Sequence, residues 1–92
     1  MIRSFKHKGL RRFFESGDKS KINPAHAKRL RLILTALQAA VEVKNLDAPG
    51  FELHRLTGDK KDFWAVKVSG NWRVIFRFEN GDAYEVDYLD YH

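Results

Sequence analysis

In the first half of the chain, apolar residues recur every three or four positions, as on one face of an amphipathic helix. Asn23 and Pro24 offer an N-cap and a first-turn proline ahead of the longest such stretch, which predicts a helix over residues 25–41. The apolar face of this helix consists of Leu30, Ile33, Leu34, Leu37 and Val41. A shorter helix is predicted over residues 6–15, where a Ser-Gly pair follows, and an opening strand over residues 2–5.

Beyond Gly50 the apolar period becomes two, which is typical of strands that are buried on one face. Turn sequences at residues 57–62, 69–71 and 79–81 separate the runs, and the last three runs predict an antiparallel meander. Together the elements predict an α+β fold, in which an N-terminal strand and two helices pack on one face of an antiparallel sheet. A chain of 92 residues is expected to form a single domain, residues 1–92.

Turn lengths decide which residues pair across these strands. A three-residue loop over residues 79–81 is expected, because a two-residue loop would set Phe76 opposite Glu85 and mix the two faces. The expected pairs are Phe76–Tyr84, Val74–Val86, Val66–Val74 and Trp64–Phe76. The inner face would then hold Trp64, Val66, Val68, Trp72, Val74, Phe76, Phe78, Tyr84, Val86 and Tyr88.

Composition narrows the function classes. The chain has no cysteine, which excludes disulfides, thiolate zinc sites and cysteine nucleophiles. No apolar run approaches the length of a bilayer span, and no apolar segment follows the basic N-terminus. We therefore expect a cytoplasmic protein with no membrane partner.

The net charge of +5 is unevenly distributed. Residues 1–31 hold ten basic and two acidic side chains, whereas residues 32–92 hold seven basic and ten acidic ones. Such asymmetry indicates a nucleic acid or an acidic protein as partner, although two well-solvated helices would explain it equally well.

The sheet face opposite the predicted core carries Lys67, Arg73 and Arg77. Cations on rigid strands can hold a phosphate with little reorganisation, so this face is a candidate site. In the expected register, Lys67 and Asp87 flank Arg73. The alternative is a solvated face on which an Arg73–Asp87 pair contributes little.

Proton-transfer groups gather at the end of the chain, where Asp90, Tyr91 and His92 follow the last strand. His54 lies on a neighbouring predicted strand, so two imidazoles could approach one pocket. Cleavage of RNA by its own 2′-hydroxyl needs a base, an acid and cations around the phosphorus. Histidine suits the acid and base roles because its ordinary pKa lies near neutrality.

The remaining histidines, His7 and His26, fall in the basic helices and are expected to be surface residues. Asp90 and His92 are separated by one residue, His54 is far away in sequence, and no metal-binding motif is present. Neither a metal nor a cofactor is therefore predicted.

Three stretches carry a more specific signal: MIRSFKHKGLRRFFESG, FELHRLTGDKKDFWAVKVSGNWRVIFRF and NGDAYEVDYLDYH. Together they resemble the HigB toxins of the RelE/ParE superfamily over essentially the whole chain. The resemblance implies a RelE-like fold and a ribosome-dependent endoribonuclease that cuts translated mRNA in the A site of the 70S ribosome. It also implies a HigA-like antitoxin as partner.

The resemblance further implies roles for individual residues. The catalytic group would be His54, Arg73, Asp90, Tyr91 and His92. Lys67 and Arg77 would add RNA contacts on the sheet. The basic helices would contact ribosomal RNA through Lys6, Lys8, Arg11, Arg12, Lys28, Arg29 and Arg31.

One departure from the family concerns Thr57, since some members have lysine at that position. Arg55 or Lys60 would have to supply the missing cation.

Two other function classes remain open at this point: a ParE-like toxin of the same fold that acts on DNA gyrase, and a non-catalytic RNA- or protein-binding module. A gyrase poison needs no acid/base set, so His54 and the last three residues argue against the first class. In the second class, replacement of His92 and Arg73 would leave growth inhibition unchanged.

Overall fold

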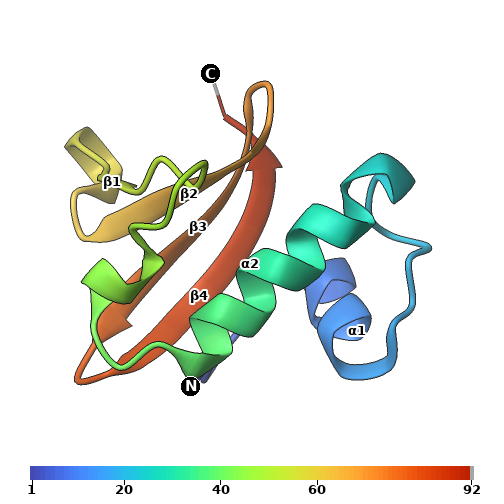
Figure 1. The fold of residues 1–92 in the computed structure, drawn as a ribbon, viewed down its shortest axis with the longest axis horizontal. Helices are drawn as coiled ribbons and strands as arrows, with labels where there is room; N and C mark the ends of the chain where they lie inside the picture. The colour runs from blue at the N-terminus through green and yellow to red at the C-terminus, as the bar shows by residue number, and fades with distance from the viewer. Residues whose placement is uncertain (92) are drawn as a thin grey trace.

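The computed structural model describes residues 1–91, which form two helices and one sheet. The elements are α1 (Lys8–Ser16), α2 (Ala27–Ala39), β1 (His54–Arg55), β2 (Phe63–Ser69), β3 (Trp72–Glu79) and β4 (Asp82–Asp90), with short 3-10 turns at Pro24–His26, Val43–Leu46 and Gly58–Lys60. Neighbouring strands are antiparallel in the order β1-β2-β3-β4. Figure 1 shows α2 crossing one face of this sheet, so the predicted α+β arrangement is confirmed.

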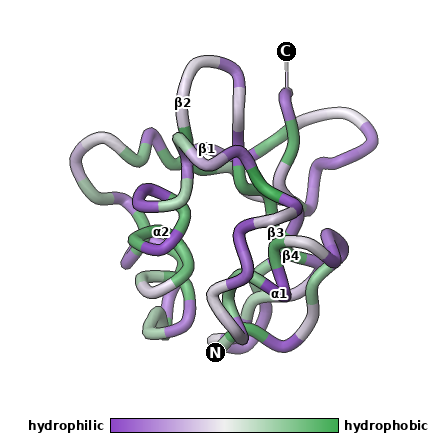
Figure 2. Tube along the Cα trace, turned by 90° about the vertical axis from the view of Figure 1, so that its right-hand side faces the viewer, coloured by the Kyte–Doolittle hydropathy of each residue, from purple (hydrophilic) through white to green (hydrophobic). Residues whose placement is uncertain are grey.

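The core lies between α2 and the inner face of the sheet. Hydrophobic and hydrophilic residues alternate along the trace of α2 in Figure 2, as expected for an amphipathic helix. The side chains that α2 buries are Ala27, Leu30, Ile33, Leu34 and Leu37. Val66, Val74 and Phe76 are fully buried on the facing strands. Val41, expected on the same helix face, is 72% exposed because α2 ends at Ala39.

Both helices begin later than the sequence predicted, because His7 caps α1 and a 3-10 turn over Pro24–His26 precedes α2. The His7 side chain accepts a hydrogen bond from the backbone N–H of Leu10 at 2.9 Å, so α1 begins at Lys8. His7 is therefore half-buried rather than a surface residue. Ahead of α2, Asn23 caps the 3-10 turn Pro24–His26 through its side chain.

The expectation of a surface position was also wrong for His26, which is 7% exposed. Its Nδ1 shares a hydrogen bond of 2.7 Å with the hydroxyl of Tyr88, and its ring lies edge-on to Trp72. Burial raises the pKa of the Tyr88 hydroxyl, which also accepts a hydrogen bond from the backbone of Asn23. A buried hydroxyl requires a polar partner, and His26 supplies it.

The N-terminal segment runs parallel to β4 but forms two isolated bridges, Ile2–Ala83 and Phe5–Val86, in place of the continuous strand expected over residues 2–5. β4 bulges between these bridges and interrupts the ladder.

Electrostatic contacts also hold the beginning of the chain on β4. Arg3 and the N-terminal amine pair with the carboxylate of Asp82 at 3.1 and 3.4 Å. The hydrogen bond from Arg3 lowers the pKa of Asp82.

The register between β2 and β3 confirms the predicted pairs Val66–Val74 and Trp64–Phe76. The register between β3 and β4 differs from the expected one. Glu79 faces Asp82, so the hairpin turns on two residues, Asn80 and Gly81, both with positive φ (50° and 82°). This is the two-residue loop that the pattern of faces had disfavoured.

A bulge in β4 adds one residue to the strand, so that apolar side chains after the short loop still point to the inner face. Glu85 has a φ of 53°, and the register shifts by one between Ile75 and Arg77. The backbone N–H of Glu85 donates a hydrogen bond to the Ser4 hydroxyl at 2.8 Å. Hydrophobic alternation alone does not reveal an extra residue in one strand, so the loop was predicted one residue too long.

The shifted register corrects three expectations. Val74 faces Tyr88 instead of Val86, and Arg77 faces Tyr84. Tyr84 therefore lies on the outer face, where the Arg77 guanidinium stacks 5.1 Å from its ring centroid, and the fully buried Ala83 belongs to the core.

The third correction concerns Arg73, which was expected to lie opposite Asp87. It pairs instead with Leu89, and Asp87 pairs with Ile75.

Within residues 1–91, none of the helices has the length and apolar character needed to cross a bilayer.

Replacing Gly81 with alanine tests the two-residue hairpin. A side chain at a φ of 82° is strained, so we expect Gly81→Ala to lower the free energy of unfolding by about 1–2 kcal/mol, measured by urea denaturation. Ser69→Ala, an exposed change beside the other hairpin, should stay within about 0.5 kcal/mol of the parent. Equal midpoints for the two variants would contradict the left-handed turn.

Candidate active site

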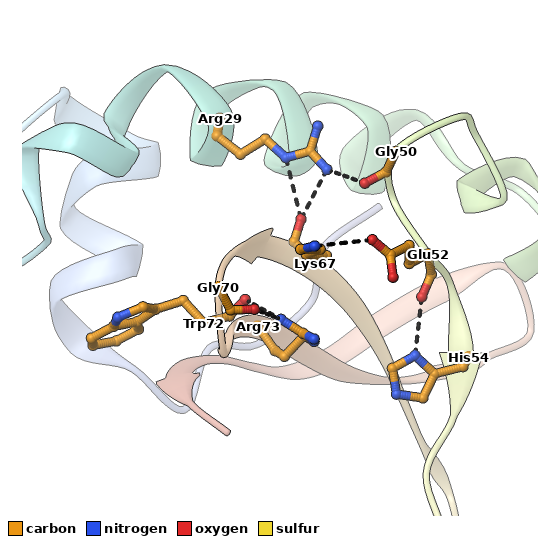
Figure 3. Close-up of polar contacts among 8 residues, drawn as sticks. All are labelled: Arg29, Gly50, Glu52, His54, Lys67, Gly70, Trp72 and Arg73. Carbon is orange, nitrogen blue, oxygen red and sulfur yellow. Dashed lines mark hydrogen bonds and ion pairs between the residues drawn. The ribbon is translucent and has the colours of Figure 1, made fainter. Parts of the chain in front are cut away.

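Three candidate residues meet on the outer face of the sheet. Lys67 of β2 pairs directly with Arg73 of β3, and His54 of β1 pairs with Ala65, two residues before Lys67. Antiparallel partners present their side chains on the same face, so the three polar side chains occupy one end of the outer face. Figure 3 shows them around the same end of the sheet.

The floor of this end of the sheet is apolar. Ala65 and Ile75 are 0% and 1% exposed and pack with the buried Leu56. The partly buried Phe63 and Leu89 pack against this cluster. The cations therefore stand beside a surface that excludes water, where their interaction with a phosphate is screened less than in bulk solvent.

The Arg73 guanidinium is held by the β2–β3 turn. Its Nη1 donates to the carbonyl oxygens of Gly70 at 2.6 Å and Trp72 at 3.0 Å. A guanidinium has five N–H groups, so further donors can contact a phosphate while Nη1 stays anchored.

Lys67 and His54 both contact Glu52, in the segment that leads into β1. The Lys67 ammonium lies 3.2 Å from the Glu52 carboxylate. Nδ1 of His54 lies 3.0 Å from the Glu52 backbone oxygen. The side chain of His54 is otherwise exposed, as a group that exchanges protons with a substrate must be.

The end of the chain lies at the same end of the sheet. Asp90 pairs with Trp72 at the end of β4, and the backbone N–H of Tyr91 donates to the Asn71 oxygen at 2.8 Å. The register places Asp90 on the Trp72 face, whereas Arg73 and Leu89 lie on the outer face. Asp90 and Tyr91 thus adjoin the turn that anchors Arg73. The predicted role of His92 lies outside the described residues.

Arg77, the other arginine of β3, is engaged elsewhere. Its Nε donates to Glu85 at 2.9 Å, and its Nη1 contacts Glu79. The hydrogen bond with Glu85 raises the pKa of this guanidinium. Four residues along a strand separate Arg77 from Arg73 by roughly 13 Å, so the two arginines do not form one cationic site.

Some family members have a lysine where this chain has Thr57. The two candidates to replace that positive charge, Arg55 and Lys60, lie on different faces of the sheet. Arg55 pairs with Trp64 on the inner face and donates to the Lys61 oxygen at 2.9 Å. The Lys60 ammonium lies 5.3 Å from the ring centroid of Phe63, which belongs to the outer apolar floor. Lys60 is therefore the one on the same face as Lys67 and Arg73.

Among the basic residues of the first 31 positions, Arg29 differs from the others. Lys6, Lys8, Arg11, Arg12, Lys28 and Arg31 are exposed. Arg29 is half-buried and donates to the Lys67 oxygen at 3.2 and 3.0 Å and to the Gly50 oxygen, with its guanidinium 5.0 Å from the Phe51 ring centroid. Sequence reasoning missed this structural role, because an arginine in a basic helix carries no signal of its partners.

No group of three or more His, Asp or Glu side chains within residues 1–91 is arranged to hold a metal ion.

The sequence matches known proteins over essentially its whole length. A family model described as "RelE-like toxin of type II toxin-antitoxin system HigB" matches residues 3–92. The chain is 44% identical over 92 residues to "Endoribonuclease HigB" of Proteus vulgaris, covering all of both chains. It is 30% identical over 96 residues to "Toxin HigB-1" of Vibrio cholerae serotype O1, covering all of this chain and 98% of the other.

These findings define the class as the RelE-like toxins of type II toxin–antitoxin systems. Within that class, the chain belongs to the HigB-like toxin family. The resemblance drawn from three sequence stretches is thereby confirmed, and membership of this family implies a cognate antitoxin as partner.

Replacing Arg29 tests its structural role. Arg29→Ala removes charged hydrogen bonds to two carbonyl oxygens, and we expect the free energy of unfolding to fall by about 2 kcal/mol in a urea titration. Lys28→Ala removes an exposed neighbour with the same charge and should change it by less than about 0.5 kcal/mol. If both variants unfold at the parental midpoint, Arg29 does not hold the site together.

Proposed function

We propose that this chain is a ribosome-dependent endoribonuclease that cuts translated mRNA in the ribosomal A site. The observation that carries the proposal is the direct pairing of Lys67 with Arg73 on the outer face, with His54 on the neighbouring strand. The Proteus vulgaris relative, 44% identical over the full length, is an endoribonuclease by name. The cytoplasm, where translating ribosomes are found, is the compartment that this activity requires.

The proposed chemistry is attack of the RNA 2′-oxygen on the adjacent phosphorus. A base takes the 2′ proton, the bond to the 5′-oxygen breaks, and an acid returns a proton to that leaving oxygen. His54 and His92 are the acid and base candidates, with Asp90 orienting or sharing the proton. The products are a 2′,3′-cyclic phosphate and a 5′-hydroxyl.

The cations of the outer face would stabilise the charge that accumulates on the phosphate oxygens. Arg73 and Lys67 lie on rigid, paired strands, so they need little reorganisation as the charge develops. Of the two candidates for the cation that Thr57 does not supply, Lys60 shares the outer face with Arg73, although it contacts Phe63 at the Arg77 end of β2 and β3. Tyr91 would stack on or position a nucleotide base, a contact worth roughly 1–3 kcal/mol.

Six of the exposed cations in the first 31 residues would bind ribosomal RNA phosphates. They are Lys6, Lys8, Arg11, Arg12, Lys28 and Arg31. Contacts to phosphates orient a protein without reading sequence. They would bring the outer face to the mRNA while the antitoxin is absent.

The arginines of β3 provide a matched test of the site. Arg73→Ala should lower the rate of codon-specific mRNA cleavage in a translating extract by about 10²-fold, because it removes a donor to the charged phosphate. Arg77→Ala, which removes a guanidinium already bound by Glu85 and Glu79, should lower it by less than about threefold. Equal losses in the two variants would contradict the placement of the phosphate at Lys67 and Arg73.

Removal of residues 90–92 tests the role of the chain end. We expect the truncated protein to keep its fold, measured by circular dichroism, and to lose mRNA cleavage, mapped by primer extension. Cleavage at the parental rate would show that the end of the chain takes no part in the chemistry. DNA damage with intact mRNA would identify a gyrase poison instead.

Ribosome binding should weaken with salt, because each phosphate contact releases counterions. Lys28→Ala should reduce the slope of log affinity against log salt by about 1. Lys44→Ala, which removes an exposed lysine paired with Glu42 outside the basic helices, should leave the slope unchanged. The measurement is co-sedimentation with 70S ribosomes over a salt series, and equal slopes for parent and Lys28→Ala would exclude this lysine from the contact.

A further inference from the structure

Glu52 contacts two candidate residues of the site through two different groups. Its backbone oxygen lies 3.0 Å from Nδ1 of His54, and its carboxylate lies 3.2 Å from the Lys67 ammonium. Figure 3 shows Glu52 between these two side chains. We propose that Glu52 is a positioning residue that fixes the tautomer of His54, so that proton exchange at the site runs through Nε2. This inference rests on the proposed function of His54.

The backbone of Glu52 adopts an uncommon conformation. Its φ is 50°, in the left-handed region that a residue with a side chain seldom occupies. Such a conformation persists only when neighbouring contacts determine it, and it is often found at functional sites.

The contacts that hold this conformation come from the preceding residues. The backbone N–H of Lys67 donates to the Phe51 oxygen at 2.7 Å, which joins the segment to β2. The Arg29 guanidinium binds the Gly50 oxygen and the Lys67 oxygen together. Residues 50 and 51 are thus fastened to β2 and α2, and the left-handed turn at Glu52 directs its carbonyl oxygen toward His54.

A carbonyl oxygen can only accept a hydrogen bond, so the hydrogen of this contact belongs to Nδ1 of His54. Nδ1 carries a hydrogen in the neutral Nδ1–H tautomer and in the imidazolium. In both states the contact is preserved, and the proton that is gained or lost is therefore the one on Nε2. The ring also keeps its orientation through the exchange, as a group that transfers protons requires.

The carboxylate of Glu52 forms an ion pair with Lys67. The two side chains are 61% and 37% exposed, so their ion pair adds little to stability. In the structure the pair turns the ammonium toward the segment before β1, on the outer face that Lys67 shares with Arg73. Glu52 thus contacts both the proton-transfer group and a candidate phosphate-binding cation.

The tautomer of His54 can be measured directly. Long-range ¹H–¹⁵N correlation spectra of the full chain, recorded at a pH where imidazoles are neutral, distinguish a protonated Nδ1 from a protonated Nε2. The His54 signals are assigned by their loss in His54→Gln. We expect the Nδ1–H form, whereas unconstrained histidine favours Nε2–H. An Nε2–H signal for His54 in the parent protein would overturn the proposal without any substitution.

Two substitutions of Glu52 separate its backbone from its side chain. Glu52→Gly tolerates a positive φ, so it should keep the Nδ1–H form although the carboxylate is lost. Glu52→Val disfavours a positive φ, so His54 should shift to the Nε2–H form and the cleavage rate at saturating ribosomes should fall by about 10²-fold. Retention of Nδ1–H in a folded Glu52→Val protein would overturn the proposal.

A matched control comes from Glu85, which also has a left-handed backbone but lies at the bulge of β4. Glu85→Val introduces comparable strain away from His54 and should leave its tautomer unchanged. A tautomer shift in Glu85→Val would attribute the effect to general loosening and overturn the role of Glu52. Undiminished cleavage by His54→Gln would instead overturn the proposed function of His54, whatever tautomer the ring shows.

Discussion

The forked hydrogen bonding of Arg29 links the helical layer to the outer face of the sheet. The guanidinium reaches from α2 to the carbonyl oxygens of Gly50 and Lys67, and Lys67 in turn binds Phe51 through its backbone N–H. Because these bonds fasten the segment before β1 onto β2, the positions of Glu52 and His54 depend on them. A planar, permanently charged fork suits this task, since it can bind two carbonyl oxygens at once.

The two faces of the sheet perform different tasks. The inner face and α2 bury aliphatic and aromatic side chains, which supply the main driving force for folding. The outer face has its own small apolar cluster around Ala65 and Ile75, and polar groups stand at its edge. Alternate side chains of β2 and β3 point to the inner and the outer face. The packing that stabilises the core therefore also keeps the backbones of Lys67 and Arg73 side by side.

Strain is concentrated at a few positions of the sheet and its approach. Glu52, Asn80 and Glu85 are the residues other than glycine with positive φ within the described part of the chain. Asn80 makes the tight hairpin, Glu85 restores the inner face after it, and Glu52 aims a carbonyl at His54. The three left-handed residues thus redirect the backbone at the hairpin, at the bulge of β4 and in the segment before β1.

The sequence by itself determined the α+β class, the long helix, the β2–β3 register and the family, because these depend on periodicity, caps and motifs that are local in the chain. It also indicated Lys67, Arg73 and His54, since the period of two assigns residues to a face. Only the tertiary structure decided the bulge at Glu85, the burial of His26, and the division of cations between structural and exposed roles. These features depend on which distant backbone oxygen or carboxylate lies within reach of a side chain, and no local pattern records that distance.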